Sequence, residues 1–306
     1  MQRRPLGNTG LHVSAISLGT VELGTDYGIQ APGEYGRPSD AEAIDVILEA
    51  VRRGINFIDT APTYGDSERL IGRALSQLDA TAVVISTKVV PATRVAVEES
   101  LDKSRVALKR DVLDIVQLHN ATPETIADPA FTGELLDAQQ KGVVRFIGAT
   151  VYGEEAALAV IESRRFQLVQ VAYSLLDQRM ARRVFARAHQ AGLGVVVRSA
   201  LLKGALTPKA RFLPAEMAAL TSAATGARDA LAGGDWTRLP EVALRFCLSA
   251  ETVSSVLTGI RTDAELEAAF AAEGKGPLSF EDQVTARQLG VTDEDLIDPR
   301  HWTSIP

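Results

Sequence analysis

Short apolar runs rich in β-branched residues alternate along this chain with longer stretches in which apolar residues recur at helical spacing. The first pattern is typical of strands buried on both faces, and the second of amphipathic helices. The predicted strands cover residues 15–18, 55–58, 83–86, 112–118, 143–147, 167–171, 193–197 and 253–257. The helices predicted to follow them cover residues 40–53, 67–75, 96–109, 132–141, 154–163, 180–191, 240–250 and 262–272. Each predicted strand is therefore followed by a helix.

Two further segments lie outside this alternation. Residues 3–14 carry a Gly-Asn-Thr-Gly turn between residues of alternating character, which predicts a β-hairpin. The segment 199–239 contains an additional predicted helix within residues 215–232. Because no low-complexity linker interrupts the repeats, we expect one α/β domain over residues 1–306. This is a single (β/α)8 TIM barrel with an N-terminal β-hairpin and an extra helix before the last strand. A doubly wound sheet is the alternative, but the sequence lacks its G-x-G-x-x-G signature.

The composition narrows the classes of partner. The 306 residues carry a net charge of −7 without a long lysine–arginine cluster, which argues against a nucleic-acid partner. Cys247 is the only cysteine, which excludes an internal disulfide and a multi-cysteine zinc site, and we expect no metal cofactor. The sequence starts without an apolar signal region, and no apolar run reaches the roughly eighteen residues that span a bilayer. We therefore expect a cytoplasmic protein without membrane contact.

Ionisable residues follow three consecutive predicted strands. Asp59 follows the strand 55–58 and Tyr64 lies in the loop after it, while Lys88 and His119 follow the next two strands. Each residue alone has a common structural role, as a helix cap, an ion-pair partner or a packing residue. Consecutive parallel strands are neighbours in a barrel, and the loops at their carboxyl ends bind ligands. We therefore expect the four side chains to meet at the mouth of the barrel.

These four side chains suit proton transfer to or from an oxygen whose charge changes during the reaction. A free tyrosine, with a pKa of about 10, is a poor proton donor at neutral pH, and the ammonium of Lys88 would favour the phenolate form of Tyr64. Asp59 would keep Lys88 charged and oriented, since an unpaired buried ammonium is costly. His119, neutral and donating from one ring nitrogen, would orient a carbonyl oxygen. The set contains no activated nucleophile and no pair of catalytic carboxylates.

Five segments carry a resemblance to a known family. They are the early L-G-N-T-G-L-H-V-S, G-I-N-F-I-D-T-A-P-T-Y-G at 54–65, S-T-K-V at 86–89, L-D-I-V-Q-L-H-N at 113–120 and V-V-R-F-I-G at 143–148. In this order they resemble the aldo-keto reductase superfamily over essentially the whole chain. The resemblance implies an NAD(P)(H)-dependent oxidoreductase that interconverts a carbonyl and an alcohol or lactone. It also implies a catalytic tetrad of Asp59, Tyr64, Lys88 and His119, in which Tyr64 is the general acid or, in the reverse direction, the general base.

The resemblance further implies residues that bind the cofactor, NADP or NAD. They are Gly19, Thr20 and Asp59 beside the nicotinamide ribose, Gln170 at the carboxamide, and Ser199, Leu201 and Lys203 at the pyrophosphate. Backbone amides and an ammonium are physically suitable partners for a pyrophosphate.

Positions near the nicotinamide depart from the family pattern. Thr150 and Val151 stand where Ser-Asn is common, so a side chain that binds the carboxamide is lost. Arg198 replaces the usual aromatic residue under the nicotinamide ring; its guanidinium can stack but brings a charge into the pocket.

The adenosine end departs from the pattern as well. The segment with Gly259 and Glu265 has lost two basic residues that would hold a 2′-phosphate, and Glu265 would repel one. Arg261 is close enough in sequence to compensate for the loss. We therefore predict that preference for NADPH is weak or that NAD(H) is used comparably.

Two other functions remain open on the same barrel. The first is a nucleotide-sensing regulatory subunit, which would bind the cofactor with negligible turnover. The second is a non-redox proton transfer, as in an epimerase or lyase, which the changes at Val151 and Arg198 make a real alternative. It would show activity without net oxidation or reduction of the cofactor.

The substrate is expected to be a small carbonyl compound. Loops 22–39 and 120–133 and the C-terminal tail should border the pocket, because specificity on this fold lies in such loops. Tyr27 and Trp302 are candidates for packing against a substrate held by Tyr64 and His119. Arg198 favours an anionic or polyhydroxylated compound, so we expect a sugar-like aldehyde, lactol or ketone. The oligomeric state cannot be derived from the chain.

Overall fold

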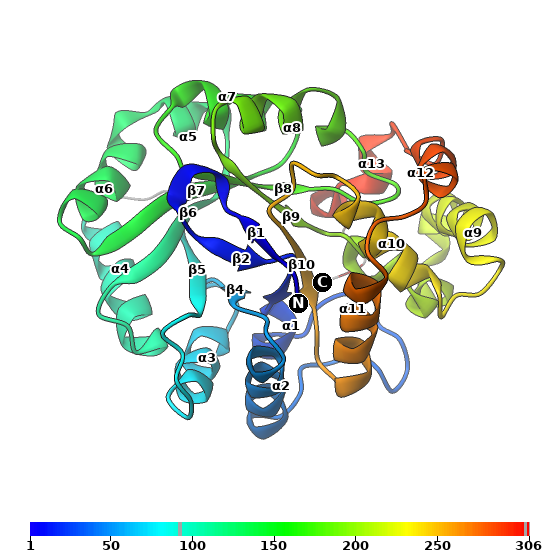
Figure 1. The fold of residues 1–306 in the computed structure, drawn as a ribbon, viewed down its shortest axis with the longest axis horizontal. Coiled ribbons are helices and arrows are strands. Elements are labelled where there is room, and N and C mark those ends of the chain that lie inside the picture. The colour runs from blue at the N-terminus through cyan, green and yellow to red at the C-terminus, as the bar shows by residue number, and fades with distance from the viewer. Residues whose placement is uncertain (91–93, 303–304, 306) are drawn as a thin grey trace.

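A closed barrel of eight parallel strands forms the centre of the molecule. The computed structural model describes residues 1–90, 94–302 and 305. The strands follow one another around the barrel in the order β10-β3-β4-β5-β6-β7-β8-β9, and helices surround them (Figure 1). The barrel strands are β3 (Ile16–Gly19), β4 (Phe57–Asp59), β5 (Val84–Val89), β6 (Leu113–Ala121), β7 (Val144–Val151), β8 (Leu168–Ala172), β9 (Gly194–Arg198) and β10 (Ser255–Gly259). Because both faces of these strands are covered, their sequences are nearly continuous apolar runs.

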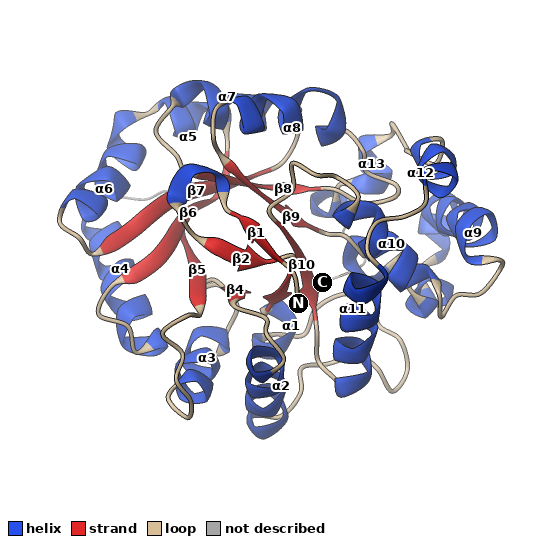
Figure 2. Cartoon of the chain, in the orientation of Figure 1, coloured by secondary structure: helices blue, strands red, loops and turns tan. Residues whose placement is uncertain are grey.

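The helices form the outer layer (Figure 2). They are α1 (Val21–Gly24), α2 (Asp40–Arg52), α3 (Ser67–Leu75), α4 (Arg94–Leu108), α5 (Pro123–Ala127), α6 (Pro129–Gln140), α7 (Glu154–Ser163), α8 (Met180–Gln190), α9 (Ala218–Ala232), α10 (Leu239–Leu248), α11 (Asp263–Lys275), α12 (Phe280–Arg287) and α13 (Glu294–Ile297). Short 3-10 turns occupy Gly7–Thr9, Leu202–Gly204, Pro208–Phe212, Ala215–Met217 and Pro299–His301. Within the described residues, no helix has both the length and the apolar character needed to cross a membrane.

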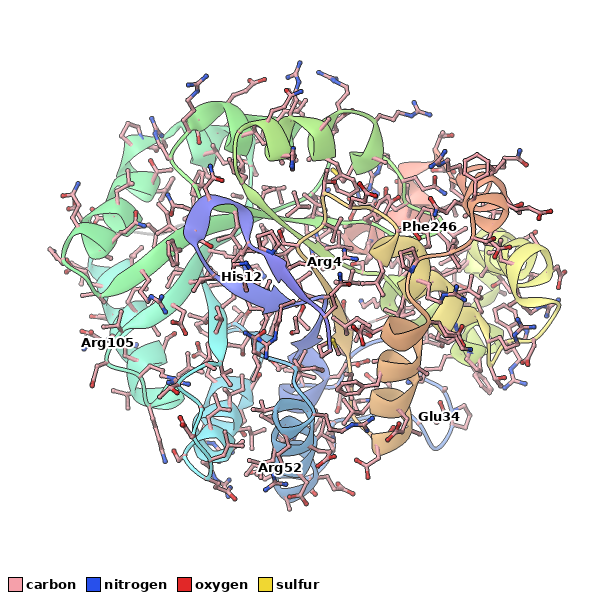
Figure 3. All side chains as sticks on the ribbon, in the orientation of Figure 1. Arg4, His12, Glu34, Arg52, Arg105 and Phe246 are labelled. Atoms are coloured by element: carbon pink, nitrogen blue, oxygen red, sulfur yellow. The ribbon has the colours of Figure 1, made fainter. Side chains whose placement is uncertain are left out.

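An antiparallel hairpin closes the amino end of the barrel. It consists of β1 (Arg3–Pro5) and β2 (His12–Ser14), and its Arg4 and His12 lie in front of the strands (Figure 3). Leu6, between these strands, is fully buried in a separate apolar cluster with Val13, Phe57, Val84, Ile115, Leu168, Val196 and Leu257. Gly194 makes room for it, because a Cβ there would lie 2.6 Å from a Leu6 methyl carbon. With this end filled, ligands can reach the barrel interior only from the carboxyl end.

The predicted barrel, hairpin and extra helix are confirmed, with differences at the element ends. Asp59 and Arg198 belong to the strands they were expected to follow. The predicted loop 120–133 is wrong, because it contains α5 and the start of α6. Both helices begin with a proline, behind Thr122 and Asp128 as N-caps, a local signal that the weak apolar pattern of these short helices concealed. Helices α12 and α13 were not predicted; both pack against α9.

We expect the hairpin to stabilise the barrel through Leu6. Replacing Leu6 with alanine leaves a cavity under the closed end and should lower the free energy of unfolding by about 2–5 kcal/mol, measured by urea denaturation. Leu11→Ala is the matched control, since Leu11 packs on the same cluster but is only partly buried. A loss for Leu6→Ala no larger than for Leu11→Ala would contradict this role.

Candidate active site

A buried ion pair lies at the carboxyl ends of two adjacent strands. Lys88 on β5 is 1% exposed, and its Nζ donates to Asp59 Oδ2 on β4 at 2.5 Å and to the carbonyl oxygen of Thr60 at 2.7 Å. Burial alone would lower the pKa of Lys88, but the charge of Asp59 and the interactions with Tyr64 together raise it above its usual value. Lys88 is therefore an ammonium in the barrel interior.

Two glutamines hold the other oxygen of Asp59. Gln170 Nε2 donates to Asp59 Oδ1 at 2.9 Å and Gln117 Nε2 donates to the same atom at 3.2 Å. Gln117 also donates to Ser86 Oγ at 2.7 Å. The carboxylate thus has a partner at each oxygen, and its orientation is fixed. Gln117 is a polar residue within the apolar run of β6, and this was a sequence signal for its hydrogen bond to Asp59. Sequence reasoning missed it.

Tyr64 lies in a tight loop directly above the ion pair. Its backbone N–H donates to the carbonyl oxygen of Ala61, and the Lys88 Nζ lies 4.8 Å from the centre of its ring. Helix α1 packs closely on this loop because of Gly24: a Cβ there would lie 1.8 Å from the Tyr64 carbonyl oxygen. Helix α1 therefore supports the backbone of this loop, and the Tyr64 ring lies against the buried ammonium.

His119 faces Tyr64 from the end of β6. The ring centres are 6.0 Å apart and nearly perpendicular, at 82°. Burial, followed by the charges of Lys88 and Arg198, lowers the pKa of His119 to about 4. The imidazole is consequently neutral near pH 7 and has one N–H to donate. The next residue, Asn120, has a φ of +53° and donates its backbone N–H to Thr150 Oγ1 at 2.8 Å, which fixes the end of the strand.

These side chains border a cavity of about 410 Å³ that extends from Asp59, Tyr64 and His119 to the start of α11. Lys88 lies beneath its floor. The predicted residues that line it are Gly19, Thr20, Tyr27, Asp59, Tyr64, His119, Thr150, Gln170, Arg198, Ser199, Leu201, Lys203, Gly259 and Glu265. Glu22 and Asn120 also line the cavity, from the loops 22–39 and 120–133 that were expected to border it. Sequence reasoning missed Tyr152, Thr207 and Lys209, which no short motif marks.

Two predicted site residues lie elsewhere. Trp302 does not line the cavity; it is 6% exposed, and its indole N–H donates to the carbonyl oxygen of Asp295, so it anchors the tail. Arg261 lines an adjacent pocket, where its Nη1 donates to the carbonyl oxygen of Gly36 and its Nη2 lies 3.6 Å from Glu265 Oε1. Its proximity in sequence did not reveal that Arg261 already contacts Gly36 and Glu265.

The segment after β9 presents cations and strained backbone to the cavity. Ser199, Leu202 and Lys203 all have positive φ, between +46° and +60°. The Lys203 Nζ lies 4.9 Å from the centre of the Tyr27 ring and donates to the carbonyl oxygen of Ile305, and burial lowers the pKa of this lysine. Left-handed backbone of this kind turns successive N–H groups toward a common point, which suits an anion.

The adjacent pocket is strongly acidic. Its lining includes Glu34, Glu42, Asp45, Asp263 and Glu265. Glu265 Oε2 accepts from the backbone N–H of Arg261 at 2.7 Å, and Glu265 Oε1 lies 3.8 Å from the Lys209 Nζ. Arg261 and Lys209 therefore share one carboxylate, that of Glu265.

Comparison with known proteins agrees with this architecture. The model of the Aldo/keto reductase family matches residues 15–288. Similar proteins include L-galactose dehydrogenase of Arabidopsis thaliana, 28% identical over 89% of this chain and 88% of that protein. The NADH-specific methylglyoxal reductase of Escherichia coli strain K12 is 30% identical over 68% of this chain and 69% of that protein.

A solved structure shows the same fold. The holo form of aldo-keto reductase AKR11C1 from Bacillus halodurans superposes with a TM-score of 0.79 at 25% identity, covering 98% of this chain and 99% of that chain. The family model covers nearly the whole barrel, and the similar proteins include oxidoreductases with the same fold. This chain therefore belongs to the aldo/keto reductase family.

Proposed function

We propose that this protein is an NAD(P)(H)-dependent reductase of small carbonyl compounds, with Tyr64 as the acid. One observation carries the proposal: the phenol of Tyr64 lies beside a fully buried lysine ammonium and opposite a neutral histidine, at one end of a cavity. A group that must give up a proton needs its anion stabilised, and Lys88, which Asp59 keeps charged, supplies a cation at that position.

The reaction would use each side chain once. Bound NAD(P)H supplies the hydride that adds to the carbonyl carbon. Tyr64 Oη gives its proton to the carbonyl oxygen, so that the product is an alcohol, and Lys88 stabilises the phenolate that remains. The N–H of neutral His119 donates to the same carbonyl oxygen and orients it. In the direction of oxidation the phenolate takes the alcohol proton.

The lining of the cavity fits a dinucleotide. Gly259 lets the side chain of Glu22 lie against the end of β10, because a Cβ on Gly259 would be only 2.2 Å from Glu22 Oε2. Lys203 and Lys209 both line the cavity, and their ammonium groups suit a pyrophosphate. Gln170 would hold the carboxamide only by sharing the amide that now donates to Asp59.

We infer that NAD(H) is used at least as well as NADP(H). The adjacent pocket is lined by carboxylates, and Glu265 lies within ion-pair distance of both Arg261 and Lys209, the cations that a 2′-phosphate would need. The Escherichia coli relative, named as NADH-specific, supports the same preference. The Arabidopsis relative, named for L-galactose, supports a sugar-like aldehyde or lactol as substrate.

The role of Tyr64 is tested by removing its hydroxyl. Tyr64→Phe should lower kcat for aldehyde reduction by about 10²–10⁴-fold, because proton donation is lost, while NADH still binds in a fluorescence titration. Tyr173→Phe is the control, since it removes the same group from a ring packed between Phe185 and Phe246, away from the cavity. Undiminished turnover in Tyr64→Phe would refute the mechanism.

The ion pair is tested through stability and turnover together. Lys88→Met leaves a buried carboxylate without its cation and should lower the free energy of unfolding by about 3–5 kcal/mol. The double variant Asp59→Asn/Lys88→Met should recover most of that stability, since no charge remains, yet stay inactive. Recovery of turnover in the double variant would show that the ammonium serves only the fold.

Cofactor preference is tested at Glu265. Glu265→Gln frees Arg261 and Lys209 and should shift the ratio of Kd values toward NADPH by about tenfold, followed by fluorescence titration of both nucleotides. Glu267→Gln is the matched control: it removes the same charge from α11, where Glu267 pairs with Arg53. A wild-type protein that binds NADPH tenfold better than NADH would contradict the inferred preference.

A further inference from the structure

The cavity contains one guanidinium whose charge has no acidic partner. Arg198 lines the cavity at the end of β9, and no carboxylate in the described part of the chain lies within ion-pair distance of it. Partial desolvation of such a cation costs free energy that an ion pair would offset. Stacking under the nicotinamide ring, the role expected from the sequence, would use the flat face of the guanidinium and would leave its charge without a partner.

Arg198 is nevertheless held in a fixed orientation. Its Nη2 donates to the carbonyl oxygen of Val151 at 3.1 Å and its Nη1 donates to Ser199 Oγ at 3.2 Å. The centre of the guanidinium lies 3.9 Å from the centre of the Tyr152 ring, so that one face is stacked. A guanidinium has five N–H donors, and two are used here. Three donors remain for a ligand.

A second arginine, Arg300, also stacks on the Tyr152 ring, and its charge is paired with a carboxylate. The centre of the Arg300 guanidinium lies 4.0 Å from the centre of the Tyr152 ring, and its Nη2 lies 2.6 Å from Oδ2 of the buried Asp298. Arg300 does not line the cavity. Tyr152 is therefore stacked with two guanidiniums, and only the one in the cavity lacks a carboxylate.

Arg198 lies near the reacting end of the cavity. It extends from β9 past β8 to the end of β7, where Thr150 fixes the backbone beside His119. Its charge is close enough to contribute to the lowered pKa of His119. A ligand bound to Arg198 would therefore lie beside the position proposed for the carbonyl oxygen.

We propose that Arg198 is a specificity-determining residue that binds a carboxylate of the substrate, so that the substrate is an aldehyde or ketone that also carries an acid group. This inference rests on the proposed reductase function. A carboxylate suits the site because a stacked, planar guanidinium offers a rigid pair of parallel donors to two oxygens in one plane. The carboxylate of the substrate would give Arg198 the negatively charged partner that Asp298 gives Arg300.

The test compares two aldehydes of the same carbon number, succinic semialdehyde and butanal, at saturating NADH. The readout is the ratio of their kcat/KM values in the wild type, Arg198→Met, Arg198→Lys and Arg300→Met. We expect the wild type to prefer the acid, and Arg198→Met to reduce that preference by about 10- to 100-fold, mainly through KM. Arg198→Lys should retain part of the preference for the acid, because the positive charge stays although the paired guanidinium donors are lost. Arg300→Met should leave the ratio unchanged.

Two binding measurements separate this inference from the proposed function. The Kd for NADH is measured by fluorescence in each variant, and succinate is titrated into wild type and Arg198→Met by calorimetry, which needs no turnover. Equal losses for both aldehydes with weaker NADH binding would mean that Arg198 serves the cofactor, and would overturn the inference. So would a wild type without preference for the acid. Turnover of neither aldehyde and no NADH binding would refute the reductase itself; succinate binding that depends on Arg198 would then still support the anion site, and its absence would overturn it.

Discussion

The structure depends on one costly feature: a lysine ammonium has been removed from water into the interior of the barrel. Lys88 can remain charged there only because Asp59 lies against it on the next strand and two glutamines fix the remaining oxygen of that carboxylate. These groups lie just below the mouth, where Asp59 and Gln170 also line the cavity. Toward the amino end the barrel holds the apolar cluster around Leu6 and a few polar residues bonded to one another, such as Ser255 and Ser17.

Much of this arrangement could be predicted from the sequence, and for physical reasons. Barrel strands buried on both faces leave a strong apolar pattern, and residues at their carboxyl ends meet because neighbouring strands are consecutive in sequence. Asp59, Tyr64, Lys88 and His119 could be placed together by that rule alone. Helices α5, α12 and α13 and the first turn of α6 could not, because they are short or weakly patterned and are fixed by caps and by packing on distant elements.

The sequence was least informative about contacts between side chains from distant segments. The sequence identified Arg198 as a departure, but not that Tyr152 would stack on it or that Arg300 would cover the other face of that ring. In the same way Arg261 was expected to be free for a phosphate and is instead held by Glu265 and the Gly36 carbonyl. A residue type indicates what a side chain is able to bind, whereas only the assembled fold shows what it has already bound.

The hairpin at the amino end of the barrel also determines where the first residue lies relative to the cavity. Met1 leads directly into β1, so the start of the chain lies on the closed end of the barrel, and the loops that surround the cavity lie at the opposite end. A tether, label or solid support joined at the first residue would leave the entrance facing solvent. The protein can in this way be displayed on a surface with its catalytic opening directed outward.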